Sequence, residues 1–104
     1  MISHPTEQSH DLSEFPIGAI VNPEEYSFRL KITGLGVKEI FAEVIKAEYL
    51  YPSAQVQPFQ VGQVLRFVPG IVMDDGTSMW NLDFRNWWFT LSKRDGRLWF
   101  EHYR

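Results

Sequence analysis

The sequence contains no cysteine among its 104 residues. This absence excludes disulfide bonds, thiolate zinc sites, iron–sulfur ligation and cysteine nucleophiles. Since 44% of the residues are hydrophobic and 15% are aromatic, the chain can build a core without a metal or a disulfide. We therefore expect a fold that depends on side-chain packing.

Long apolar runs are absent too, because no run approaches the ~20 residues that a membrane-spanning helix needs. The first residues, MISHPTEQSHDLSEF, lack the basic and apolar regions of a secretory signal peptide. These absences predict a soluble, cytoplasmic protein. The net charge of −3 and the pI near 5.5 argue against broad, non-specific binding to nucleic acid or to an anionic membrane.

Catalytic and cofactor-binding motifs are missing as well. The sequence has no G-x-S-x-G, no phosphate-binding glycine loop, no H-E-x-x-H and no dinucleotide fingerprint. His102 follows the alternation of a strand and is predicted to face the core. His4, His10 and Asp11 fall in a polar segment that has no fixed geometry for a metal. We expect no catalytic residue, no cofactor and no metal site.

The charge is unevenly distributed along the chain. Residues 1–48 carry eight acids and four bases, residues 49–78 carry two acids and one base, and residues 79–104 carry three acids and five bases. The segment charges are therefore −4, −1 and +2, which sum to −3. The C-terminal segment is the basic part of an acidic chain.

The chain is expected to form one domain. Residues 1–14 are rich in polar residues and predict a disordered tail, so the β-rich domain spans residues 15–104. In the clearest β segment Phe28, Leu30 and Ile32 alternate with polar residues, as in a strand with one buried face. Gly34 is expected to end this strand. Strands are predicted near residues 16–21, 27–33, 61–68, 79–84, 87–92 and 97–103.

Residues 37–49 fit two structures. Their apolar residues Val37, Ile40, Phe41, Val44 and Ile45 recur at helical spacing. The same segment is rich in β-branched and aromatic residues, which favour a strand; that strand would bury the face formed by Phe41, Ile45, Ala47 and Tyr49. The predicted fold is mainly β, a small antiparallel barrel or two-sheet sandwich in which residues 37–49 are a long strand or a single helix. The alternative is an α+β fold with one helix on an antiparallel sheet.

Three of the four tryptophans lie in WNLDFRNWWFTL, residues 80–91. Two alternating apolar sets occur here, and their parity changes at Arg85-Asn86; the sets are Trp80, Leu82 and Phe84, then Trp87, Phe89 and Leu91. A bulge in one continuous strand and a two-residue hairpin turn both place the two sets on one core face. The reluctance of arginine to adopt a positive φ favours the bulge. The hairpin would pair Trp80 with Leu91.

The next connection contains Asp95-Gly96, a turn signal. A four-residue loop over 93–96 would pair Leu91 with Leu98. This loop and a two-residue turn at Asp95-Gly96 both place Trp88 and Trp99 on a second, mixed face, whereas a three-residue loop would put Trp99 in the core. The mixed face is either covered by another element or exposed for binding.

The leading functional prediction is a non-catalytic binding module of the inhibitor, adaptor or assembly-subunit type. Tryptophan, tyrosine and arginine dominate the energetics of protein interfaces, and the mixed face is rich in them. Its partner would be another protein or a second copy of the chain. The predicted partner-binding residues are Trp88, Trp99, Tyr103, Arg97, Glu101, Thr90, Asp83 and Asn81.

Two other functions compete with protein binding. A small barrel can bind single-stranded nucleic acid by stacking bases on aromatic rings, and the basic residues for this alternative are Arg85, Lys93, Arg94, Arg97 and Arg104. A small-molecule or sugar site is the third possibility, with polar contacts from Asp83, Asn81 and Glu101. As an enzyme, the chain would use Asp83 and Glu101 as paired carboxylates.

Overall fold

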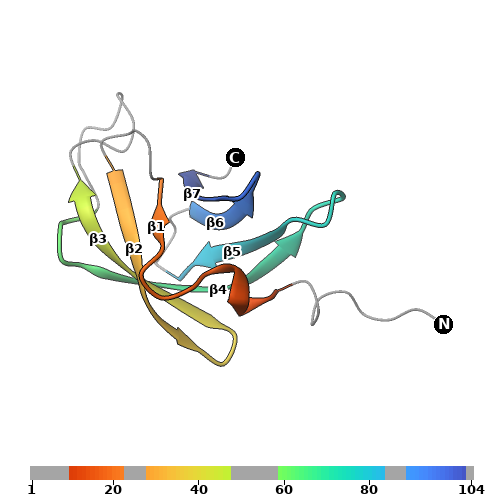
Figure 1. The fold of residues 1–104 in the computed structure, drawn as a ribbon, viewed down its shortest axis with the longest axis horizontal. Helices are drawn as coiled ribbons and strands as arrows, with labels where there is room; N and C mark the ends of the chain where they lie inside the picture. Colours follow the sequence, from red (N-terminus) through yellow and green to blue (C-terminus); the bar gives the residue numbers. More distant parts are fainter. Residues whose placement is uncertain (1–9, 23–27, 48–58, 84–88, 103–104) are drawn as a thin grey trace.

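The computed structural model describes residues 10–22, 28–47, 59–83 and 89–102. These residues form a closed barrel in which the strands follow one another in sequence order (Figure 1). All neighbouring strands are antiparallel except β1 and β7, which are parallel. The predicted small β-barrel is confirmed, and the described ranges form neither a two-sheet sandwich nor an α+β fold. The elements are η1 (Leu12–Glu14), β1 (Ile20–Val21), β2 (Phe28–Gly36), β3 (Glu39–Ala47), β4 (Val64–Val72), β5 (Ser78–Leu82), β6 (Phe89–Arg94) and β7 (Arg97–His102).

Strand β2 follows the predicted alternation, with Phe28, Leu30 and Ile32 buried. The prediction that Gly34 ends the strand is wrong. Gly34 pairs with Phe41, and the ladder between β2 and β3 continues to Gly36. Pairing with a neighbouring strand outweighs the low strand propensity of glycine.

Of the two structures expected for residues 37–49 the strand is found, since β3 spans Glu39–Ala47, and the helix alternative is wrong. Ile40, Ala42 and Val44 are buried inside the barrel, whereas Ile45 is 38% and Val37 91% exposed. The helical stripe is therefore split between the two faces of a strand. The strand alternative expected the core face to contain Phe41 and Ile45, which is wrong. β2 and β4 pair on either side of β3 and set which of its faces turns inward. Residues 48–49 lie outside the described part.

Strands β5 and β6 are antiparallel neighbours that pair Trp80 with Leu91. The bulged continuous strand favoured by the sequence is therefore wrong, and the pairing expected of a hairpin is found. Trp80 and Leu91 are fully buried, as are Leu82 and Phe89 to within a few per cent, which confirms the predicted core face. Residues 84–88, where the predicted bulge or turn falls, are outside the described residues.

The connection between β6 and β7 is a two-residue turn at Asp95-Gly96. Both residues have positive φ, 55° and 77°, as a type I′ turn requires, and glycine adopts such values without strain. Lys93 pairs with Leu98 and Leu91 with Phe100. The three-residue and four-residue loops are thus wrong, and Trp99 lies on the opposite face from Phe100.

Aromatic rings fill the interior of the barrel. The ring of Phe100 stacks on Phe89 at 5.1 Å between centroids and on Phe28 at 5.2 Å. Phe59 and Phe67 approach Phe100 edge-on at 5.9 and 5.7 Å. All five side chains are at most 3% exposed, so this part of the barrel is a packed core.

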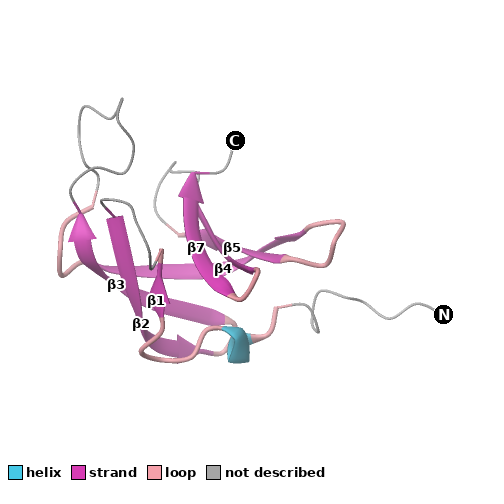
Figure 2. Cartoon of the chain, turned by 45° about the horizontal axis from the view of Figure 1, so that its top comes forward, coloured by secondary structure: helices cyan, strands magenta, loops and turns pink. Residues whose placement is uncertain are grey.

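One end of the barrel is covered by residues 10–15, which include η1 (Figure 2). Phe15 is fully buried and meets Trp80 edge-on at 6.0 Å. His10 is 4% exposed, lies 5.1 Å from Trp80, and its Nε2 donates to the carbonyl oxygen of Met79 at 3.1 Å. Residues 10–14 belong to the predicted tail yet lie against the barrel, while residues 1–9 are outside the described part.

The barrel closes where β1 meets β7, and among the described residues Val21 and Leu98 form the one residue pair there. The backbone N–H of Asn22 donates to Leu98 at 2.9 Å. The side-chain amide of Asn22 then accepts from the N–H of Phe100 at 3.0 Å and donates to its carbonyl at 3.3 Å. A side chain thus extends the backbone ladder by one more step.

Candidate binding surface on the C-terminal strands

The outer side of β5, β6 and β7 carries most of the predicted binding residues that the structure describes. Asn81, Thr90 and Glu101 form one row across the three strands, and Ser92 and Trp99 form part of the next. Because side chains alternate along a strand, they share one side, here called the C-terminal outer face. Its residues are Asn81, Thr90, Ser92, Arg94, Arg97, Trp99 and Glu101.

Trp99 is the aromatic centre of the C-terminal outer face. Its ring is partly exposed and lies opposite Ser92, whose side chain is buried beside it. The Arg94 guanidinium carbon sits 5.9 Å from the ring centroid, within the range of a cation–π contact. The same guanidinium forms an ion pair with Glu101 at 2.6 Å.

Arg94 therefore holds Trp99 and Glu101 in a defined arrangement. The indole N–H of Trp99 adds a long hydrogen bond to the Arg94 carbonyl, at 3.4 Å. The sequence assigned Arg94 to nucleic-acid binding, not to this cluster. The signal that could have found the cluster was the Asp95-Gly96 turn, since a two-residue turn fixes which residues of β6 and β7 are neighbours.

Asp83 does not form a carboxylate pair with Glu101. Asp83 pairs with Arg66, which also reaches Glu39 at 2.6 Å across β3 and β4. The hydrogen bond that Arg66 donates to the Glu39 carboxylate is the main cause that raises the pKa of Arg66 above its usual value. Each of the two carboxylates is matched with its own arginine, so the geometry of a paired-carboxylate site is not found.

The remaining predicted site residues fall into two groups. Arg97 is exposed and lies opposite Arg94 in the register of β6 and β7, on the C-terminal outer face. Thr90 belongs to the same face but is only 6% exposed, so little of its side chain is available to a partner. The other group lies outside the described residues: Trp88, Tyr103, Arg85 and Arg104.

The basic residues near the β6–β7 turn do not line up on one surface. Lys93 pairs with Leu98, whereas Arg94 pairs with Arg97, so neighbouring cations point to opposite sides of the hairpin. Arg94 is also neutralised by Glu101. The described part of the chain thus offers no continuous cationic track on β6 and β7.

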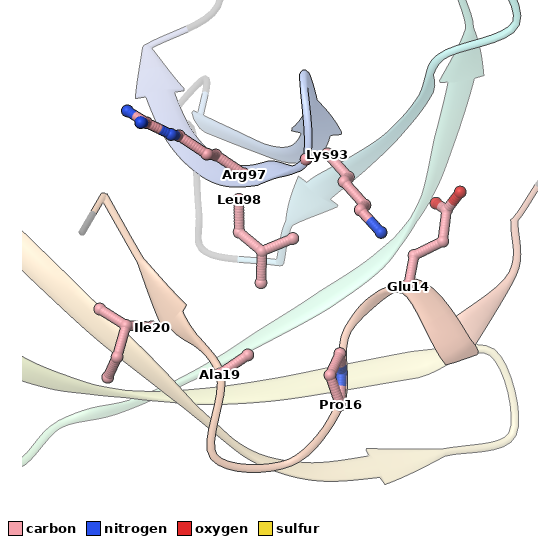
Figure 3. A pocket seen from close by; sticks show the side chains of 8 residues that line it. Glu14, Pro16, Ala19, Ile20, Lys93, Arg97 and Leu98 are labelled. Atoms are coloured by element: carbon pink, nitrogen blue, oxygen red, sulfur yellow. The ribbon is translucent and has the colours of Figure 1, made fainter. Parts of the chain in front are cut away.

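A groove that the sequence did not predict lies beside the meeting point of β1 and β7, with a volume of about 230 Å³ (Figure 3). It is called the seam groove below. Leu98 points into it, Lys93 extends across its mouth toward the Glu14 side, and Arg97 points away. No local pattern could have found it, because it depends on segments about 80 residues apart. Its lining residues are Glu14, Pro16, Ala19, Ile20, Lys93, Gly96, Arg97 and Leu98.

Two other kinds of site are absent from the described ranges. No group of three or more His, Cys, Asp or Glu side chains there could hold a metal ion. No helix in the same ranges is long and apolar enough to cross a membrane. Comparison with protein families, with curated proteins and with solved structures found no match for this chain.

Proposed function

We propose that this chain is a non-catalytic binding module that recognises a protein partner through the C-terminal outer face, with Trp99 as its anchor. The observation that carries the proposal is the position of Trp99. Its ring is partly exposed on the outside of a barrel and is held by Arg94 and Glu101.

The interior of the barrel is filled by packed side chains. Seven aromatic side chains are buried by at least 97% in the described core, namely Phe15, Phe28, Phe59, Phe67, Trp80, Phe89 and Phe100. With this volume occupied, a partner meets the chain on an outer surface. A fixed aromatic ring is a favourable anchor, because binding costs less when its conformation is already set.

The arrangement of charge supports a protein partner over single-stranded nucleic acid. Strand binding needs cations that follow a backbone alongside the stacking rings. Here Arg94 is paired with Glu101, and Lys93 lies on the other side of the hairpin. A surface that pairs an aromatic ring with both an arginine and a carboxylate matches the mixed polarity of protein interfaces.

The test compares proteins retained from a nuclease-treated extract of the source cells by the wild type, by Trp99→Ala and by a control. Val37→Ala is the control, because Val37 is 91% exposed at the distant β2–β3 turn. We expect the wild type and Val37→Ala to retain the same protein at a stoichiometric level, and Trp99→Ala to lose it. Equal retention by all three proteins would contradict the proposal, as would binding that needs nucleic acid and disappears steeply with salt.

A further inference from the structure

The hairpin of β4 and β5 extends beyond the rest of the barrel in both views (Figures 1 and 2). Three hydrogen bonds close its turn: Met73 N–H donates to the Thr77 carbonyl at 2.8 Å, Gly76 N–H to the Met73 carbonyl at 2.9 Å, and Thr77 N–H to the Asp75 carboxylate at 2.9 Å. Residues 71–77 are called the hairpin tip. A preordered tip loses little conformational freedom when it binds.

The hairpin tip combines exposed apolar side chains with acidic ones. Ile71 is 53% and Met73 is 41% exposed, and Asp74 and Asp75 follow directly and are also exposed. Asp75 is engaged by Thr77 within its own turn. Within the described residues Asp74 has no ion pair, so its carboxylate is available to an external cation.

The seam groove has the complementary chemistry. Ala19, Pro16 and Leu98 supply apolar walls, and Ile20 beside them is 37% exposed. Lys93 extends across the mouth (Figure 3), and across the described ranges no carboxylate lies within ion-pair distance of its ammonium group. The seam groove thus offers an apolar pocket edged by an available cation.

We propose that the chain associates with itself head to tail, the hairpin tip of one copy occupying the seam groove of the next. Asp74 then meets Lys93 of the second copy, while Met73 covers Leu98 and Ile20. Both surfaces are present on every copy, and the two residues do not form an ion pair within one chain. This association uses surfaces other than the C-terminal outer face and does not depend on the function proposed above.

Such a contact has definite physical properties. The two partners contribute different surfaces, so each added copy leaves one tip and one groove free, as in any heterologous interface. A contact made by one hairpin tip buries a small area, which places it among weak, reversible associations. Its charged component is screened by salt, so we expect association to weaken as ionic strength rises.

The test is sedimentation velocity of the full chain over a concentration series into the millimolar range. The mass-average sedimentation coefficient of the wild type should rise with concentration. Asp74→Lys and Lys93→Asp should each lower the association constant at least about tenfold, because like charges replace an attraction. Trp99→Ala should associate as the wild type does, which separates this contact from the proposed partner surface.

Mixing the two charge variants gives the decisive result. The intact tip of Lys93→Asp fits the intact groove of Asp74→Lys, and the two substituted surfaces also carry opposite charges. The mixture should therefore regain the concentration-dependent association that each variant alone has lost. Nuclear magnetic resonance of the wild type on dilution should show shifts confined to residues 71–77 and to the groove, whatever the variants' stability. A wild type whose sedimentation does not change with concentration would overturn the proposal, and so would dilution shifts centred on Trp99.

Discussion

The side-chain amide of Asn22 pairs with both backbone groups of Phe100, accepting from its N–H at 3.0 Å and donating to its carbonyl at 3.3 Å. Asn22 is 3% exposed and adopts a left-handed φ of 59°. It ends β1 and closes the barrel in the same residue, because asparagine tolerates this conformation and its amide reproduces the donor and acceptor of a peptide group.

Replacing Asn22 should therefore destabilise the protein without altering its surface. Asn22→Gly keeps the positive φ accessible but leaves the N–H and carbonyl of Phe100 without this partner. We expect a loss of about 2–3 kcal/mol and a fall in Tm of more than about 8 °C, measured by thermal unfolding. Asn81→Ala serves as the control, since Asn81 is an exposed amide. A change of Tm no larger than that of the control would mean that the amide does not close the barrel.

Two adjacent residues of β7 should differ sharply in their contribution to stability. Phe100 is 3% exposed at the centre of the ring cluster, and Phe100→Ala should cost about 3–5 kcal/mol. Trp99 lies partly exposed on the other side of the strand, and Trp99→Ala should cost about 1–2 kcal/mol. Denaturant unfolding measures both. Equal losses would place Trp99 in a core and remove it as a binding anchor.

Gly70 and Asn81 should be energetically coupled. A Cβ atom at position 70 would lie 2.5 Å from the Asn81 Oδ1 atom, so the amide must move before any larger residue fits. Gly70→Ala should be at least about 0.5 kcal/mol more favourable in an Asn81→Ala background than in the wild type. A double-mutant cycle of unfolding free energies gives this coupling directly. Additive effects would show that Asn81 does not occupy the space over Gly70.

The acidic tip should stabilise the fold in a pH-dependent manner. The backbone N–H of Thr77, the largest influence, and its side chain lower the pKa of Asp75 below the ordinary value of 3.8. A carboxyl whose folded pKa is lowered adds stability above its unfolded pKa and loses it as pH falls through the folded value. Asp75→Asn keeps the acceptor oxygen but cannot titrate.

The Tm difference between the wild type and Asp75→Asn should therefore be constant above about pH 5 and change as the pH falls below 3.8. A carboxyl titration by nuclear magnetic resonance checks the pKa of Asp75 independently. A Tm difference that stays the same down to the acid limit would show that Thr77 does not stabilise the ionised form.

Local sequence patterns predicted the structure correctly where a few neighbouring residues determine it. The alternation of Phe28, Leu30 and Ile32 predicted their burial, and the core face containing Trp80 and Leu91 was correct under either connection. The positive φ required at Asp95-Gly96 marked the turn between β6 and β7. These features depend on side-chain alternation and on the φ values that each residue type prefers, and both can be recognised in a stretch of a few residues.

Other features depended on pairing between distant segments. β3 has an apolar period that fits a helix, and its register is set by β2 and β4 on either side. Arg85 favoured a bulge within one continuous strand, yet the segments before and after it form two strands, β5 and β6, that pair antiparallel. The seam groove and the role of Asn22 required knowing that β1 lies beside β7, which no local pattern contains.

The pairing of Val21 with Leu98 also has a consequence for biosynthesis. During translation β1 is made before the other strands of the barrel, and its partner across the seam is made 77 residues later. Until β7 has left the ribosome, Val21 and the aromatic rings that pack against Phe100 cannot be fully buried. Contacts of such long sequence separation form slowly, and an unclosed sheet with exposed rings is prone to aggregation. We therefore expect the nascent chain to remain a client for chaperones until the last strand emerges, and the barrel to form as one late event.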